Sequence, residues 1–193
     1  MIDLEPAARR MASLLASVSD RQLDLPTPCP ATSVGDLVDH VSTLTTGFTA
    51  VARKETSGGG GPGPPAPSAA NLDEGWRERI ARDLETLAQA WRDASAWDGM
   101  TAAAGIDLPG AVAGLVALDE LIVHGWDIAV SLGRQYEPSP AEIEAAVSFV
   151  QSFDAPRDGN LFGPVVRVPD DAAPFERLLG LTGRDPGWQP PSD

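Results

Sequence analysis

The fold of this 193-residue chain is decided by its most apolar stretch, Leu108–Leu132, which reads LPGAVAGLVALDELIVHGWDIAVSL. The stretch is long enough to span a bilayer. However, four ionisable residues lie in its middle, where each charge would cost several kcal/mol in a membrane: Asp119, Glu120, His124 and Asp127. We therefore expect a buried helix of a soluble, cytoplasmic protein, without a membrane partner.

Helical periodicity also dominates the rest of the sequence, and strand signals are scarce. Ser33 followed by Asp36 predicts a capping box at the start of a helix, and Gly133 suits a helix C-terminal cap. The predicted helices run from Leu4 to Val18, from Ser33 to about Arg53, from about Leu72 to Ala96, from Pro109 to Gly133, from Ser139 through Phe153, and near Phe175–Leu181. This pattern favours an all-α, up-and-down helical bundle with additional elements.

Two segments lack such periodicity. Residues 57–71, SGGGGPGPPAPSAAN, contain four consecutive glycines and scattered prolines, which cannot form a packed element. We expect a flexible crossover loop, with a mobile lid over a site as the alternative. Residues 160–193 are Pro-rich and are expected to form an irregular tail with one short helix. We expect residues 1–193 to form a single domain.

Composition excludes several classes of protein. The 14 basic and 28 acidic residues give a net charge of −14, which disfavours binding to nucleic acid or to an anionic membrane. Cys29 is the only cysteine, so no intrachain disulfide can form. The N-terminus carries charges at Asp3, Glu5, Arg9 and Arg10 and lacks the apolar stretch of a signal peptide.

The polar residues of the apolar stretch form a stripe. Glu120, His124, Asp127 and Ser131 follow spacings of four, three and four, which place them on one helix face. This face is either exposed to solvent or directed into the bundle, where a metal ion can satisfy buried polar groups. The stripe contains no lysine or arginine, the usual residues of a solvated face, and Glu120 and His124 lie one turn apart and can converge on one ion.

His40 supplies a third potential ligand. It lies between Leu37 and Leu44 on the second predicted helix and borders the apolar face. A histidine there is either a hydrogen-bonded core residue or an inward-facing ligand. Two imidazoles and one carboxylate leave an open coordination position, as in catalytic rather than structural metal sites.

Other candidates have simple structural interpretations beside the functional ones. Cys29, in Pro28-Cys29-Pro30, precedes a helix N-terminus, where its thiolate would be stabilised, or is a small packing residue. Asp127 either orients a metal-bound histidine or is solvated or a capping residue.

Three blocks of the sequence resemble an actinobacterial family of metal-binding proteins. They are LDLPTPCPATSVGDLVDHV (Leu23–Val41), DELIVHGWDIA (Asp119–Ala129) and FGPVVRVPDDAAPFERLLGLTGRDP (Phe162–Pro186). The family belongs to the DinB-like superfamily and is similar to the N-terminal domain of mycothiol-dependent maleylpyruvate isomerase. The sequence departs from the family pattern at Thr32-Ser33, where Trp-Thr is usual, and at Gly35, where a basic residue is usual.

The resemblance implies a four-helix up-down-down-up bundle, often a homodimer, that holds zinc or nickel. Carried over by motif, the metal ligands are His40, Glu120 and His124. Characterised relatives are thiol-dependent transferases and isomerases, in which the metal holds the thiol of mycothiol or a similar molecule as the nucleophile. The isomerase's separate C-terminal domain has no counterpart in this sequence, so isomerase activity itself is not expected.

Three functions follow from these observations. The first is a metal-dependent transferase that activates a small-molecule thiol, such as mycothiol, against an electrophilic small molecule. The second is a non-catalytic metal- or ligand-binding module of a stress response, and the third is a plain helical bundle with a solvated polar stripe. The sequence names neither the metal nor the substrate.

Overall fold

The computed structural model describes residues 1–55, 66–152 and 162–191. It is mostly helical, as the sequence predicts, with one small two-stranded sheet. The elements are α1 (Glu5–Ala16), η1 (Asp20–Gln22), α2 (Val34–Ala52), η2 (Ala69–Asn71), α3 (Trp76–Ala90), α4 (Ala94–Trp97), β1 (Met100–Ala103), β2 (Ile106–Pro109), α5 (Gly110–Ser131), α6 (Pro140–Ser152) and α7 (Pro174–Leu181).

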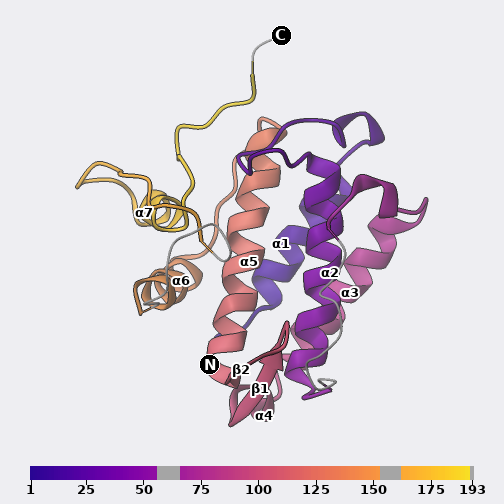
Figure 1. Ribbon diagram of the computed structural model, residues 1–193, viewed down its shortest axis with the longest axis vertical. Coiled ribbons are helices and arrows are strands. Elements are labelled where there is room, and N and C mark those ends of the chain that lie inside the picture. The colour runs from indigo at the N-terminus through magenta and orange to yellow at the C-terminus, as the bar shows by residue number, and fades with distance from the viewer. Residues whose placement is uncertain (56–65, 153–161, 192–193) are drawn as a thin grey trace.

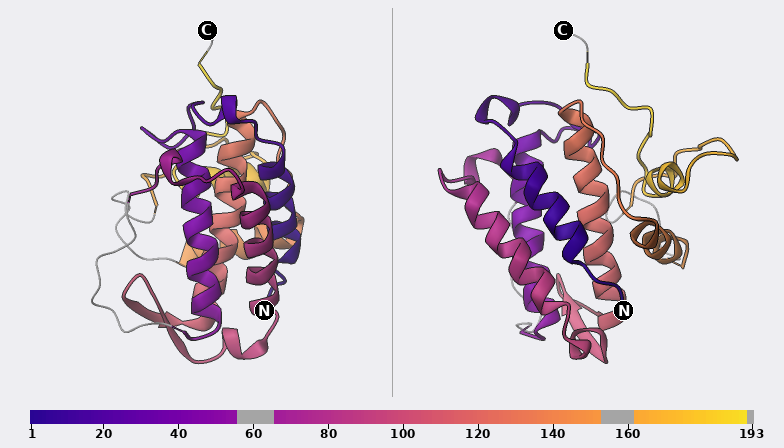
Figure 2. Two further views of the ribbon diagram at one scale, coloured as in Figure 1. Left: turned by 90° about the vertical axis from the view of Figure 1, so that its right-hand side faces the viewer. Right: turned by 180° about the vertical axis from the view of Figure 1, so that it is seen from behind.

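Four long helices, α1, α2, α3 and α5, lie side by side and share one core (Figures 1 and 2). Both α1 and α2 contact α3 and α5. Each helix presents the apolar stripe expected from its sequence. The largest fully buried side chains come from all four helices and include Met11, Leu37, Leu84 and Leu118. This packing holds the middle of α5 against α2, which sets the position of the polar stripe.

The helices α6 and α7 lie on the opposite side of α5 from α2 and α3 (Figure 1). A partly buried ion pair ties α6 to α1, because Arg10 donates to both carboxylate oxygens of Glu142, at 3.3 and 2.9 Å. The Arg10 guanidinium also lies over the ring of Tyr136, 5.5 Å from its centroid. The α6–α7 unit is thereby fixed beside α5, where it carries the C-terminal segment toward the polar stripe.

The helix caps read from the sequence are present. Ser33 caps α2 by accepting a hydrogen bond from the backbone N–H of Asp36, whose carboxylate accepts one in return from the N–H of Ser33. At the other end of the long apolar stretch, Gly133 adopts a left-handed backbone with φ of 66° just after α5. These two caps fix one end each of α2 and α5, the helices that carry His40, Glu120 and His124.

The third predicted helix, Leu72–Ala96, is corrected by the structure. It begins later, at Trp76, and ends at Ala90, and a separate turn, α4, follows. The break has a local cause, since the Asp93 carboxylate accepts hydrogen bonds from the backbone N–H and the hydroxyl of Ser95. Such side-chain bonds compete with helix continuation and start a new helix instead.

The hairpin of β1 and β2 was not predicted. The strands pair antiparallel, with Ala103 opposite Ile106, and are joined by Ala104 and Gly105 at φ of 50° and 79°. Two consecutive left-handed residues are typical of the tight turn that joins hairpin strands. Strands of four residues are too short to show a clear alternation in sequence.

The predicted crossover loop and C-terminal tail lie only partly within the described residues. Of the crossover loop expected at 57–71, residues 57–65 lie outside the described residues, as do residues 160–161 and 192–193 of the expected tail. The tail contains a short helix, α7, where one was expected near Phe175–Leu181. Within the described ranges, no helix is both long and apolar enough to cross a membrane.

Candidate metal centre

The polar stripe of α5 is directed into the protein. Asp127 is fully buried, Ser131 is 3% exposed and His124 is 9% exposed. The interpretation of this stripe as a solvated face is therefore wrong. A buried stripe needs partners for its polar atoms, and neighbouring elements supply several of them.

His40 reaches the stripe from α2. Its ring lies edge-on to the ring of His124, with the centroids 5.0 Å apart. The Glu120 Oε2 atom lies 2.8 Å from His124 Nε2 and 3.9 Å from His40 Nε2. One potential ligand atom from each of the three residues therefore lies within 4.8 Å of the others.

This spacing fits a tetrahedral metal site. Nitrogen and oxygen ligands bind zinc at about 2.0–2.1 Å, so two ligand atoms of a tetrahedron lie about 3.3 Å apart. The observed 2.8 and 3.9 Å fall on either side of that value, so small side-chain rotations would centre an ion. Two nitrogens and one carboxylate suit zinc or nickel among other divalent metals.

The other ring nitrogen of His124 is held by Asp127. Nδ1 lies 3.0 Å from Asp127 Oδ2, one turn further along α5. A carboxylate on Nδ1 orients the ring and directs Nε2 toward Glu120, as in carboxylate–histidine–zinc arrangements, and a metal ion bound at Nε2 would take the place of the proton there. Of the two interpretations of Asp127, the structure favours orientation of His124, because a fully buried carboxylate is not solvated.

Arg184 was not predicted as a site residue, yet it completes this arrangement. Its guanidinium donates from Nη2 to Asp127 Oδ2 at 3.1 Å and from Nε to Oδ1 at 3.4 Å. Arg184 lies just beyond α7, in the block of sequence that ends in GRDP. That block was the signal available in the sequence, but nothing local indicates that its arginine reaches α5.

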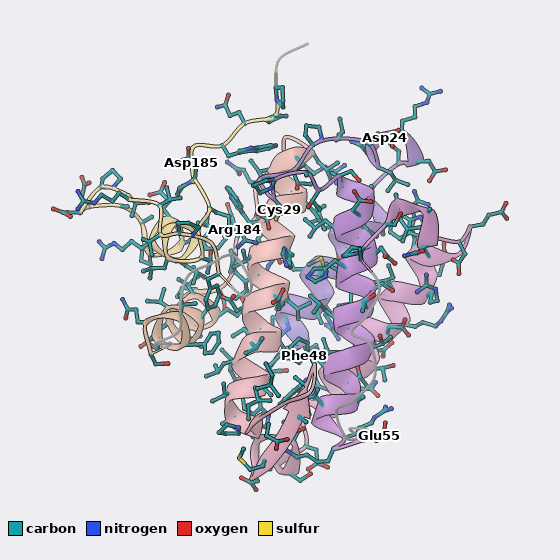
Figure 3. All side chains as sticks on the ribbon, in the orientation of Figure 1. Asp24, Cys29, Phe48, Glu55, Arg184 and Asp185 are labelled. Atoms are coloured by element: carbon teal, nitrogen blue, oxygen red, sulfur yellow. The ribbon has the colours of Figure 1, made fainter. Side chains whose placement is uncertain are left out.

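Cys29, in the loop before α2, contacts the same residue of α5 as Arg184, and Figure 3 shows the two side by side. The thiol of Cys29 donates to Asp127 Oδ2 at 3.4 Å, and Arg184 Nη2 lies 3.7 Å from the sulfur. Cys29, His124 and Asp127 thus form a second group with potential metal-ligand atoms within 4.8 Å of one another. This second group is the poorer site, because Asp127 is already paired with Arg184 and with His124 Nδ1.

The charges of the site are strongly coupled. Burial lowers the pKa of His40, and the neighbouring His124 lowers it further, so His40 is neutral and able to bind a metal. Burial alone would lower the pKa of His124, but Glu120 and Asp127 hold it well above its usual value. Burial would raise the pKa of both carboxylates, yet His124 holds the pKa of Glu120 and of Asp127 below its usual range.

A pocket of about 670 Å³ gives access to these residues. Its walls come from α2, α5, the loop before α2 and the segments on both sides of α7. The lining side chains include His40, Glu120 and His124 together with Cys29, Asp119 and Arg184. The pocket is large enough for a small-molecule ligand, and its apolar wall includes the buried ring of Phe162.

Within the described part of the chain, Asp119 differs from the other acidic residues of the pocket in its lack of a hydrogen-bond partner. It is 5% exposed, and its Oδ1 atom is buried without a hydrogen-bond partner among the described residues. Burial and the adjacent charge of Glu120 raise its pKa to about 8. Sequence reasoning noted Asp119 as a charge within the apolar stretch but gave it no function.

Comparisons with known proteins identify a family and two relatives of this chain. The sequence model of one family, described as the mycothiol maleylpyruvate isomerase N-terminal domain, matches residues 4–129. Two uncharacterized proteins of Mycobacterium tuberculosis, one from strain CDC 1551 / Oshkosh and one from strain ATCC 25618 / H37Rv, are each 26% identical over 179 residues, which cover 90% of this chain and 91% of theirs. No solved structure matches the chain significantly.

Proposed function

Because the chain belongs to the family of the mycothiol maleylpyruvate isomerase N-terminal domain, we propose that it binds one divalent metal ion through His40, Glu120 and His124 and uses it on a small-molecule thiol. The observation that supports this most directly is the convergence of these three side chains, from two helices, on one wall of a pocket. Zinc and nickel are the proposed metals.

The residues around His40, Glu120 and His124 support the same function. Asp127 sets the tautomer of His124, and Arg184 balances the charge of Asp127. A divalent cation bound there supplies a Lewis acid that lowers the pKa of a thiol. The pocket gives room for the thiol and for an electrophilic small molecule, which makes a metal-dependent transferase the proposed activity.

The first test is metal analysis of protein purified without a histidine tag. We expect close to one metal per chain in the wild type and in Thr43→Ala, an exposed neighbour on α2, and loss of metal in His40→Ala. Cys29→Ala should retain the metal. Loss in Cys29→Ala with retention in His40→Ala would move the site to Cys29, His124 and Asp127, and absence of metal from the wild type would leave a plain helical bundle.

The second test concerns the thiol. Mycothiol added to the metal-loaded protein should raise the thermal unfolding temperature, because a ligand that binds the folded state stabilises it. The metal-free protein should show no rise. A metal-loaded protein that responds to no cellular thiol would instead be a non-catalytic metal-binding module.

The family also supports proposals about architecture. We propose that α1, α2, α3 and α5 form the up-down-down-up bundle of the DinB-like superfamily, which their mutual contacts support, and that residues 1–193 form a single domain. We also propose that the protein is a homodimer and lies in the cytoplasm. Light scattering of the purified protein would test the dimer.

A further inference from the structure

The carboxyl group of Asp119 lacks the partners that the other acidic groups of the pocket have. Asp127 is bonded to His124, Arg184 and Cys29, and Glu120 pairs with His124. Asp119 forms no hydrogen bond or ion pair with any described residue, and its Oδ1 is fully buried. A buried polar group without a partner destabilises the fold, so its presence calls for a partner that binds from outside.

Asp119 lies beside the metal centre rather than within it. It precedes Glu120 on α5, so its side chain leaves the helix about 100° around the axis from that ligand. Accordingly, it belongs to neither group of potential metal ligands. It does line the same pocket as His40, Glu120 and His124, together with Val123 one turn further on. A molecule that contacts these three residues therefore occupies the same pocket as Asp119.

We propose that Asp119 binds a hydrogen-bond donor, an amide N–H or a hydroxyl, of the thiol whose sulfur is directed to His40, Glu120 and His124. This inference rests on the proposed function and narrows the ligand to thiols that carry such a donor a few bonds from the sulfur. A site built to pair with an N–H or O–H rejects an analogue that lacks it, because the buried acceptor is then left unpaired.

The test compares two thiols of equal size in calorimetric titrations of the metal-loaded protein. One is the N-methylamide of mercaptopropionic acid, which has an N–H donor, and the other is its methyl ester, which has none. We expect the wild type to bind the amide about tenfold more tightly than the ester. Asp119→Ala should bind both about equally, whereas Asp119→Asn should keep a preference for the amide because it keeps an oxygen acceptor.

Two controls make the outcome decisive. Asp107→Ala, the same change at an exposed position of β2, should behave as the wild type. Thermal unfolding of Asp119→Ala should occur at the wild-type temperature or above, because an unpaired buried carboxyl is removed. An unfolded Asp119→Ala protein, or one that still prefers the amide tenfold, would overturn the inference while leaving the proposed function intact. Failure of the metal-loaded wild type to bind either thiol would overturn both.

Discussion

Substitution of Arg184 by methionine should destabilise the protein far more than the loss of an ordinary surface ion pair. The Arg184 Nη2 atom lies 3.1 Å from Asp127 Oδ2, and the two side chains are 15% and 0% exposed. Two unit charges at that distance attract by about 5 kcal/mol at an effective dielectric constant of about 20. Burial lowers the pKa of Arg184, but its neighbours, Asp127 foremost, together raise it above its usual value, so the guanidinium stays charged.

The expected loss of stability arises because Arg184→Met leaves the buried charge of Asp127 without its arginine partner. A buried charge that loses its partner typically destabilises a protein by about 3–5 kcal/mol. Asp127 keeps its bond to His124, whose positive charge offsets part of the loss, so we expect a decrease of about 3 kcal/mol in the free energy of unfolding. The measurement is urea unfolding of metal-free protein. Asp127→Asn and the double variant complete a thermodynamic cycle, in which the double variant should lose less than the sum of the two single changes.

Arg79→Met is the control, because it removes an exposed ion pair together with one hydrogen bond to the hydroxyl of Ser42. Arg79 Nε lies 3.4 Å from Asp73 Oδ2, with side chains 36% and 62% exposed, and such pairs contribute about 0–1 kcal/mol. If Arg184→Met costs no more than this control, or if its effect adds fully to that of Asp127→Asn, the buried pair does not hold the C-terminal segment on α5.

Two further changes test the packing around the site. Gly125→Ala should lower the free energy of unfolding by about 1–3 kcal/mol or more, because a Cβ there would lie 2.2 Å from the Tyr136 hydroxyl. Gly47→Ala, with nothing within 4 Å of its Cβ, should instead stabilise α2 by about 1 kcal/mol. Equal effects of the two changes on thermal unfolding would contradict this expectation. Glu142→Gln should cost about 1–3 kcal/mol near neutral pH. Burial raises the pKa of Glu142, but Arg10 and the backbone N–H of Ser139 outweigh burial and lower it. The contribution is therefore complete above the unfolded-state pKa of about 4.3 and is lost as the pH falls through the lower folded-state pKa. Unfolding of both proteins over this range should show the difference shrinking in acid, and a constant difference would refute the assignment.

The sequence by itself determined the helices with strong local signals. Ser33 and Asp36 define the start of α2 through bonds between residues three apart, and Gly133 ends α5 through its own backbone conformation. The spacing of Glu120 and His124 likewise fixes their proximity, because residues four apart share a helix face. Such features depend on neighbours within one helical turn and can be read without the fold.

Only the tertiary structure decided what surrounds those residues. The helix α5 is apolar on nearly all sides, so its sequence does not show which elements cover the polar stripe. Arg184 reaches Asp127 across 57 residues of sequence, and Asp119 is left without a partner because of what packs around it. Neither fact has a local signal, since both depend on the side of α5 on which α6, α7 and the segment after them come to rest.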